Sequence, residues 1–466
     1  MNAGPHLSRL PETASDGLRI VLEETEPKCL RTFTPTQAVL HRAYGSLLET
    51  VDGKRLFDFT SGVLVANLGH NPRFWLRRYG ELMAWPAAPT DEDGEYVSAV
   101  PMTTYNAATP LEALASERLL AFVRRFPGGG RLTNVLWAAS GSEAVQKALW
   151  ACQGWDRTRP LIVATRNGFH GKKGLAGAVS GSEQDSERDP RVQFVSFPMH
   201  ESVDLQSDTS AFDPSPYVRE LELLVHRFGR RIGTFITEPY LGGGGSFHPP
   251  LPYLKAVQDF CRRHDILFVL DEVQSNFGRT GAMFAFEKYE LEPDFVVLGK
   301  GLGNGVPTAA VVGRRDVLAA MNYGEGSDTW SGNPLNCAAV VATLDEFERR
   351  DVLQAMQTSS AVIRAGLIEL KRFPFVAHVR GECGGMVWGL ETADHAGVPA
   401  AAWAEQLVLA AYLGDGERGV HLLGPLAKKV VRISPPLTIT ANQAREAMTM
   451  LHRAAERLQA LIPESA

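Results

Sequence analysis

The sequence has few cysteines and no concentrated positive charge. Its five cysteines form neither a CxxC pair nor a Cys/His cluster with metal-ligand spacing. No run of Lys and Arg exceeds two residues, and 53 acidic residues outnumber 47 basic ones. These absences exclude a disulfide-framed fold, a cysteine-based zinc site and a basic stripe for nucleic acid. We therefore predict a mildly acidic protein of the reducing cytoplasm, with no metal and no nucleic-acid partner.

Long apolar runs are also missing. No stretch approaches 18 uninterrupted apolar residues, and the first 17 residues contain no apolar signal-peptide core. Neither a membrane span nor export is predicted. No repeat with a period of 20–50 residues is visible, so the 466 residues must be organised as two or three ordinary domains.

What the sequence does contain is an alternation of β-rich runs and helical patterns between about residues 130 and 315. The predicted strands are Asn134–Ala138, Leu161–Ala164, Gln193–Ser196, Ile232–Thr237, Ile266–Leu270, Phe295–Leu298 and Ala309–Val312. Amphipathic segments such as residues 253–264 separate them, which is typical of βαβ crossovers and a mostly parallel, buried sheet. The predicted fold class is therefore α/β.

The two ends of the chain have other patterns. Residues 47–60 place an Asp-Gly turn between two strand-like runs, which predicts a hairpin. A long helical stretch over residues 338–375 precedes short strands near 386–390 and 430–433. The last helix opens with a capping box of Thr440 and Gln443. We predict a large domain at 81–340 and a small α+β domain at 341–466, with residues 1–80 packed on the small domain.

Three segments put distinctive side chains at the carboxyl edge of this sheet, where open parallel sheets bind ligands. Ser140 and Glu143 predict a capping box, and Gly141 between them lets an anion approach the helix N-terminus. Asp271 ends an apolar strand, where a carboxylate holds either a magnesium ion or a proton on a heterocyclic nitrogen. Lys300 follows another apolar strand in a glycine-rich turn, where poor solvation favours a neutral, nucleophilic amine.

Taken singly, these segments have ordinary alternatives: a capped helix, a solvated carboxylate and a surface lysine. Nucleotide sites fit poorly, because no Gly-Lys pair precedes Ser or Thr and no run satisfies GxGxxG. Together the three segments offer a phosphate site, a partner for a ring nitrogen and an amine for an aldehyde. Pyridoxal 5'-phosphate needs those three groups, so we predict it as the cofactor.

The residues then resemble a known family, the class III (ω-type) pyridoxal-phosphate-dependent aminotransferases of fold type I. The resemblance covers roughly residues 40–450. The segments that carry it are SGSEA at 140–144, GFHG at 168–171, EP at 238–239, DEVQ with FGRTG at 271–281, LGKGLGNGVP at 298–307, SGNPL at 331–335 and RISPPL at 432–437. It implies the fold type I architecture: a large domain with a mostly parallel central sheet, plus a smaller α+β domain.

The resemblance also implies roles for individual residues. Lys300 would form a Schiff base and shuttle a proton, and Asp271 would pair with the pyridinium nitrogen; these two are the expected catalytic residues. The other expected cofactor-binding residues are Gly141, Ser142, Phe169, His170, Glu238, Val273, Gln274 and Thr329. Thr329 is implied to reach the phosphate of a neighbouring subunit, which implies a homodimer with shared active sites. Arg432 is implied to bind a substrate carboxylate, with a structural salt bridge as the alternative.

Two positions depart from the family pattern. Gly243 stands where members acting on ω-amino acids with 2-oxoglutarate have a glutamate that screens the arginine, which argues against the 4-aminobutyrate and ornithine subgroups. Ser275 and Asn276 replace the usual Thr-Gly after DEVQ. The expected function is transfer of an amino group from an amino acid or amine to a 2-oxo acid through a Lys300 Schiff base and a pyridoxamine intermediate. An aminomutase and a cofactor-binding protein without transaminase activity are the alternatives.

Overall fold

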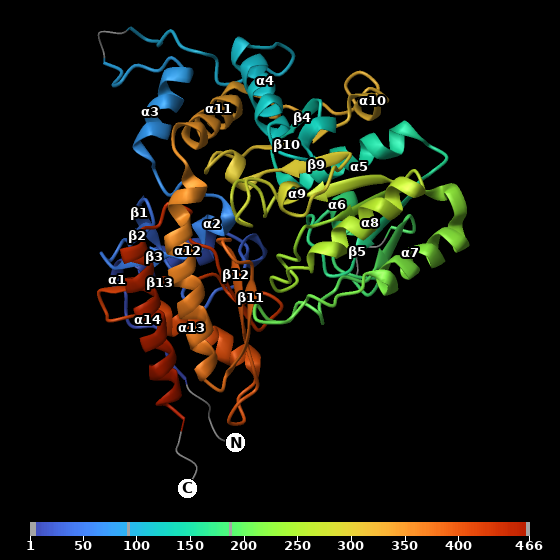
Figure 1. Cartoon of the computed structure of the whole chain (residues 1–466). Helices are drawn as coiled ribbons and strands as arrows, with labels where there is room; N and C mark the ends of the chain where they lie inside the picture. Colours follow the sequence, from blue (N-terminus) through green and yellow to red (C-terminus); the bar gives the residue numbers. More distant parts are fainter. Residues whose placement is uncertain (1–5, 91–93, 186–188, 463–466) are drawn as a thin grey trace.

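The largest sheet of the protein has seven strands in the order β4-β10-β9-β8-β7-β5-β6 (Figure 1). A computed structural model describes residues 6–90, 94–185 and 189–462. Strands β5 to β9 pair in parallel, whereas β10 is antiparallel to both β4 and β9. The strands are β4 Asn134–Ala138, β5 Leu161–Thr165, β6 Val192–Val195, β7 Ile232–Thr237, β8 Leu267–Asp271, β9 Phe295–Leu298 and β10 Ala309–Gly313. The prediction of an α/β fold with a mostly parallel sheet is confirmed.

Both faces of this sheet are buried. In β8, Phe268 and Leu270 belong to one apolar cluster and Leu267 and Val269 to another, because successive side chains of a strand point to opposite faces. Helix α5 (Gly141–Trp155) covers the second face and α8 (Leu251–Arg263) contributes to the first. Apolar residues at nearly every strand position are therefore the signature of a sheet covered on both sides.

Capping residues and prolines mark where several helices begin. Thr109 caps α4 and Asn333 caps α11, and each is followed by a proline at the first helical position, where a missing N–H costs nothing. The other helices around the large sheet are α4 Pro110–Arg124, α6 Gly174–Ala178, α7 Ser215–Phe228, α9 Ala285–Lys288, α10 Arg315–Leu318 and α11 Pro334–Arg349.

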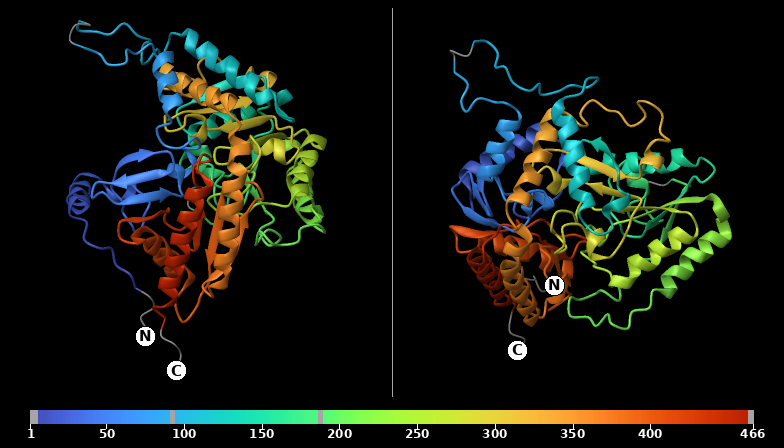
Figure 2. Two further views of the ribbon diagram at one scale, coloured as in Figure 1. Left: turned by 60° about the vertical axis from the view of Figure 1, so that its left-hand side comes forward. Right: turned by 45° about the horizontal axis from the view of Figure 1, so that its top comes forward.

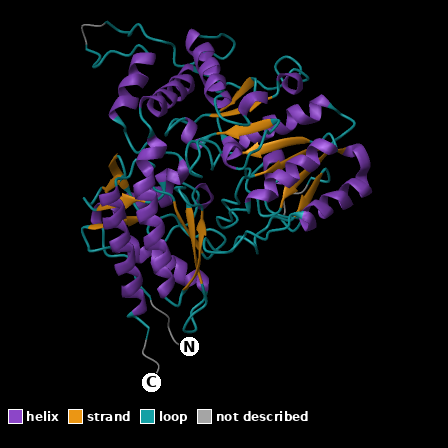
Figure 3. Ribbon diagram, in the orientation of Figure 1, coloured by secondary structure: helices purple, strands orange, loops and turns teal. Residues whose placement is uncertain are grey.

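A second sheet joins the beginning of the chain to a strand near its end (Figure 3). Its order is β1-β2-β3-β13, and β13 pairs in parallel with β3. The predicted hairpin is confirmed as β2 and β3. The elements are α1 Thr13–Thr25, β1 Leu40–Tyr44, β2 Leu47–Thr50, β3 Arg55–Asp58, α2 Ser61–Leu64, α3 Arg73–Leu82 and β13 Arg418–His421. The domain boundaries drawn from the sequence stay a prediction.

The third sheet, β11-β12-β14, is antiparallel and lies beside three long helices. Strand β14 carries Arg432. The predicted capping box of Thr440 and Gln443 is confirmed at the start of the last helix. The bounds are β11 Val376–Gly381, β12 Trp388–Thr392, β14 Val430–Ile433, α12 Val352–Glu369, α13 Ala400–Leu413 and α14 Ala441–Gln459.

The long helical stretch predicted over residues 338–375 is divided into two helices. Helix α11 ends at Arg349, and Arg350 has an extended backbone. Asp351 then caps α12, its side chain accepting a hydrogen bond of 2.9 Å from the Gln354 N–H. An aspartate that accepts from the N–H three residues later is a signal for the start of a helix. At Asp351 this signal begins a new helix within the apolar periodicity.

Between α3 and α4, the described residues 83–90 and 94–109 extend away from the rest of the chain, as both views in Figure 2 show. Its described residues include exposed apolar side chains, among them Trp85, Tyr96 and Met102. Within the described ranges, no helix is both long and apolar enough to cross a membrane.

Candidate active site

Four strands deliver polar side chains to one edge of the large sheet. Strand β8 ends at Asp271, β7 is followed directly by Glu238, and β9 is followed two residues later by Lys300. Strand β5 leads into the GFHG segment that contains His170. Because these four strands are parallel, their carboxyl ends meet at the same edge.

Asp271 and His170 form a buried pair. Oδ2 of Asp271 lies 2.7 Å from Nδ1 of His170, and Oδ1 accepts a 3.0 Å hydrogen bond from the Val273 N–H. Burial lowers the pKa of His170, but its hydrogen bond to Asp271 and the charges of Asp271 and Glu238 outweigh burial, so this pKa is raised above its usual value. Nε2 of His170 is buried and makes no hydrogen bond to any described residue.

A second buried chain of hydrogen bonds runs from Glu238 through Gln274 to Arg432. Gln274 Nε2 donates to Oε1 of Glu238 at 2.7 Å, and Gln274 Oε1 accepts from Arg432 at 2.8 Å. Oε2 of Glu238 accepts from the Phe169 N–H at 2.8 Å. Burial raises the pKa of Glu238 to about 7, and burial lowers the pKa of Arg432.

Arg432 has no carboxylate within ion-pair distance among the described residues, and its buried Nε makes no hydrogen bond there. Removing a guanidinium from water without a counter-charge costs on the order of several kcal/mol of desolvation free energy. The structural salt bridge considered for Arg432 is therefore absent from the described part of the chain. This arrangement can bind an incoming carboxylate.

Lys300 begins a short 3₁₀ turn, Lys300–Leu302, with a backbone φ of 47°. That left-handed conformation is unfavourable for a residue with a Cβ atom, by roughly 1–2 kcal/mol. Its amine makes no hydrogen bond or ion pair within the described ranges. Burial, and then the charge of Arg432, lower the pKa of Lys300 to about 8 against the opposing charges of Asp271 and Glu238. The neutral, nucleophilic form of this amine is therefore reached at lower pH than in an ordinary lysine.

The N-terminus of α5 lies against the residues that follow β8. A Cβ atom at position 141 would lie 2.9 Å from Cγ1 of Val273, so glycine is the residue that fits. A Cβ atom at Gly171 would lie 2.5 Å from Oγ of Ser142, which places the GFHG segment beside this helix end. Gly141, Ser142, Val273 and GFHG thus come together around backbone N–H groups that can bind an anion.

The predicted capping box at this helix is half right. Ser140 accepts from the Glu143 N–H at 3.3 Å, as expected for an N-cap. The Glu143 carboxylate instead accepts from the Ala139 N–H at 2.9 Å, one residue earlier than a capping box requires.

The side chains of two predicted site residues take no part in these contacts. Phe169 is 43% exposed, and its Cβ lies 3.0 Å from where a side chain at Gly243 would begin. Thr329 is exposed in the loop between α10 and α11. That loop is anchored by Asp328, which accepts from Lys147 at 2.5 Å.

The comparison with protein families decides the identity. Residues 31–455 match the family described as aminotransferase class-III. The chain is a class III aminotransferase. It is 32% identical over 416 residues to the 2-aminoadipate transaminase of Pseudomonas putida, covering 86% of this chain and 92% of that one. It is 29% identical to the 4-aminobutyrate aminotransferase of Mycobacterium leprae, over 88% of this chain and 89% of that one.

Solved structures resemble the aminotransferase over nearly its whole length. The (S)-enantioselective omega-transaminase of Thermomicrobium roseum superimposes with a TM-score of 0.79 at 25% identity, covering 97% of this chain and 100% of that one. An amine transaminase from an uncultivated Pseudomonas species, in its PLP-bound form, gives a TM-score of 0.75 at 25% identity, with 93% and 97% covered. The predicted fold type I architecture is confirmed.

Class III aminotransferases use pyridoxal phosphate (PLP), and the residues of this aminotransferase fit that cofactor. The N-terminus of α5, where Gly141 leaves the backbone accessible, suits a phosphate, the buried carboxylate of Asp271 suits a protonated ring nitrogen, and the amine of Lys300 suits an aldehyde. The predicted cofactor is therefore confirmed at the level of the family, and the aminotransferase is PLP-dependent.

Sequence reasoning missed several residues that hold this site together. Arg279 is fully buried and donates to Asn67 Oδ1 at 2.7 and 2.9 Å and to the carbonyls of Met386 and Pro435. Burial lowers the pKa of Arg279 to about 9. Its place in the FGRTG segment was a signal that it matters, but no single sequence shows which distant carbonyls it contacts.

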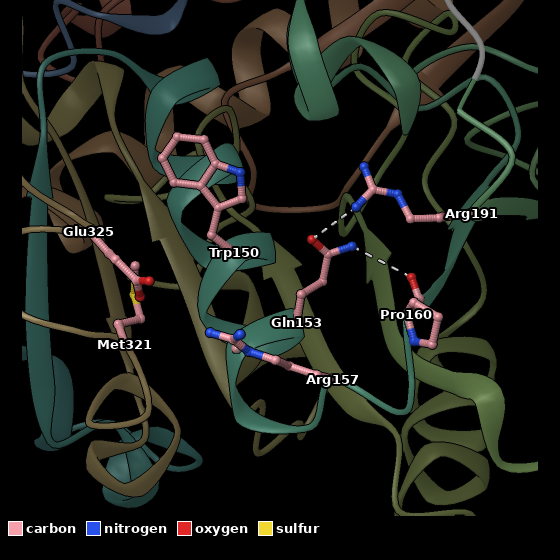
Figure 4. A pocket seen from close by; sticks show the side chains of 8 residues that line it. Trp150, Gln153, Arg157, Pro160, Arg191, Met321 and Glu325 are labelled. Atoms are coloured by element: carbon pink, nitrogen blue, oxygen red, sulfur yellow. Dashed lines mark hydrogen bonds between the residues drawn. The ribbon is translucent and has the colours of Figure 1, made fainter.

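The described surface also has a hollow away from this edge (Figure 4). It has a volume of about 520 Å³ and is lined by Trp150, Gln153, Gly154, Arg157, Pro160, Arg191, Met321 and Glu325. It lies at the C-terminal end of α5, whereas Gly141 and Ser142 lie at the N-terminal end, about 20 Å away along the helix. It contains none of the predicted site residues.

Proposed function

We propose that this aminotransferase moves an amino group from an amino acid to a 2-oxo acid, and that Arg432 binds the carboxylate of both. The main support is that Arg432 is buried and has no carboxylate partner among the described residues. It also lies close enough to Lys300 for its charge to lower the pKa of that amine. Gly243 has no side chain at the position where the family members that act on ω-amino acids with 2-oxoglutarate have a screening glutamate. The relatives named above are transaminases of 2-aminoadipate and 4-aminobutyrate, both amino acids, which supports a carboxylate-bearing donor.

The other residues receive roles that follow from their surroundings. Lys300, with its low pKa and unpartnered amine, accepts the proton released from the donor carbon and returns it on the acceptor. Asp271, held by His170, keeps a proton on the ring nitrogen. Gly141 and Ser142 bind the phosphate at the N-terminus of α5. When bound, PLP supplies the electron sink that lets the donor C–H bond break.

Three more residues surround the ring in this proposal. Gln274 donates to the phenolic oxygen with the amide hydrogen that Glu238 leaves free, because an amide nitrogen has two hydrogens and Glu238 accepts one. Val273 packs beneath the ring beside Gly141, and Phe169 covers the opposite face.

The test is the visible absorption of the purified holoenzyme, followed while donors are added in matched pairs. Each pair is an amino acid and the amine left when its carboxylate is removed. We expect the amino acid to bleach the yellow band at concentrations about a hundredfold lower than the amine, because a charge-assisted bidentate contact is lost. Equal bleaching by both members of every pair would contradict the proposed carboxylate contact, and no bleaching by any donor would contradict the proposed donor class.

Replacing Arg432 with methionine is expected to raise the KM for the 2-oxo acid about a hundredfold, with a smaller change in kcat, since the lost contact is made before the chemical step. Steady-state kinetics with varied acceptor measure this. Arg432→Lys is the matched control: it keeps the charge but not the planar fork, so an intermediate KM is expected. An unchanged KM in Arg432→Met would show that the carboxylate binds elsewhere.

We further propose that two copies share their active sites, with Thr329 of each contributing to the phosphate site of the other. The support is the exposure of Thr329 together with the exposed apolar side chains of residues 84–90, 94–109 and 319–333, among them Tyr105 and Trp330. Aromatic residues are enriched at interfaces relative to the rest of a protein surface.

A mixing experiment tests the shared site. Lys300→Ala and Thr329→Glu homodimers are each expected to be inactive, the second because a carboxylate repels the phosphate. Co-refolded in equal amounts, they should recover about a quarter of the native sites, because half of the dimers are mixed and each contains one intact site. Failure to recover activity, or a monomer in sedimentation, would contradict the proposal.

We also propose a reducing compartment, the cytoplasm, for this enzyme. All five cysteines are free thiols, and Cys152, Cys261 and Cys337 are buried. Cell fractionation of the native host checks this, and enzyme in an oxidising compartment would contradict it.

A further inference from the structure

Asn276, one of the two positions that depart from the family pattern, is buried beside the turn that carries Lys300. Its side-chain Nδ2 donates to the carbonyl of Glu272 at 2.6 Å and to the carbonyl of Gly299 at 3.1 Å. Because both partners are acceptors only, the nitrogen rather than the oxygen of the amide faces them. The side chain therefore links the loop after β8 to the residue immediately before Lys300.

The Gly299 carbonyl is the one that closes the turn. It accepts from the Leu302 N–H at 3.0 Å, across Lys300, and from Asn276 with its second lone pair. Lys300 itself is held at a φ of 47°. Such a conformation persists only where the surroundings fix it, and the Asn276 amide bonds to the carbonyl directly before it.

The other side of Lys300 is confined as well. A Cβ atom at Gly301 would lie 2.5 Å from Nδ2 of Asn67 and 3.1 Å from Oδ1 of Asn276. Asn67 is itself fixed, because its Oδ1 accepts from Arg279 and its Nδ2 donates to the Phe277 carbonyl at 3.1 Å. Gly299 thus bonds to Asn276, and Gly301 lies against both Asn276 and Asn67.

We propose that Asn276 is a positioning residue: through the Gly299 carbonyl it holds the Lys300 turn in its left-handed form and so fixes the direction in which the amine is presented. This rests on the proposed role of Lys300. A glycine here, the usual family residue, cannot make the contact, so this chain positions its lysine with a group that the family pattern lacks.

The test compares Asn276→Ala and Asn276→Gly with the native enzyme. The readout is the rate at which cofactor-free protein and added PLP form the yellow complex, measured across pH. We expect this rate at neutral pH to fall ten- to a hundredfold in both variants, as for other small displacements of a reacting group. The pH midpoint of the rate should also move, because a reoriented amine lies differently toward Asp271 and Arg432. Asn276→Gly is included because glycine is the family's residue, so this variant is expected to fold.

Two further variants separate positioning from stability. Ser275→Ala removes a neighbouring buried hydrogen bond, of 3.1 Å to the Glu272 carboxylate, without touching the turn, and should leave the rate and its pH midpoint unchanged. Asn276→Leu keeps about the same volume but has no hydrogen-bond donor, so it should behave like Asn276→Ala. A native rate and midpoint in Asn276→Leu or Asn276→Gly would overturn the proposal, as would an equal shift in Ser275→Ala.

Reduction with borohydride distinguishes this proposal from the proposed role of Lys300. If native enzyme is not trapped covalently at Lys300 by reduction, the role of Lys300 fails, and the positioning proposal fails with it. If native enzyme is trapped and the Asn276 variants load at the native rate, only the positioning proposal fails.

Discussion

Transamination by Lys300→Ala is expected to fall by about 10⁴-fold or more, the combined loss of a covalent attachment and a general acid–base group. The amine has a pKa lowered to about 8 and no competing hydrogen bond among the described residues, so no nearby group is placed to replace it. The measurement is single-turnover and steady-state transamination with the best donor from the matched panel. PLP binding should persist but become removable by dialysis.

The matched control is Lys172→Ala, because Lys172 is an exposed lysine two residues beyond His170 at the same edge of the sheet. It should retain native activity. Small primary amines added to Lys300→Ala should restore part of the rate, since they supply the missing base from solution. A Lys300→Ala enzyme that transaminates near the native rate would rule out the proposed mechanism.

Asp271→Asn is expected to lower kcat by about 10²–10³-fold, the usual cost of removing one buried group that stabilises charge in the transition state. Asparagine keeps the shape of the side chain but cannot stabilise a proton on a ring nitrogen. The substitution also removes the charge of Asp271, which raises the pKa of His170. Burial should then lower that pKa, so this histidine should become neutral at a lower pH than in the native enzyme. The kcat and the His170 titration by NMR measure the two effects.

Asp294→Asn is the control for this variant. Asp294 is also a buried aspartate of the large sheet, but it precedes β9, at the opposite edge, and accepts from the Phe268 N–H at 2.9 Å. Its replacement should lower the free energy of unfolding while leaving kcat per folded enzyme unchanged. If both variants lost kcat equally, the effect of Asp271 would be one of general stability.

The strands and caps of the fold were predictable because their signals are local. Strands β4, β7 and β9 follow from short apolar runs, and Ser140 and Thr440 cap their helices through N–H groups three residues away. The interruption at Asp351 was missed because apolar periodicity continues on both sides of it, although a capping signal was present in the sequence.

The contacts of the site were less predictable, because they join residues far apart in the chain. His170 and Asp271 are 101 residues apart, and Arg432 and Gln274 are 158 apart. The family resemblance named these residues, but only the strand order shows which of them touch. The contact between Asn276 and Gly299 had no signal in the sequence beyond the unusual residue itself.

The pairing of β3 with β13 has a consequence for how the chain is made. Residues 55–58 leave the ribosome about 360 residues before their partners at 418–421. At typical elongation rates of about 5–20 residues per second, the N-terminal strands therefore wait roughly 20–70 seconds with one edge unpaired. An unpaired edge is a template for association with other chains. We therefore expect the chain to depend on chaperones while it is being translated, although this edge is paired in the folded protein.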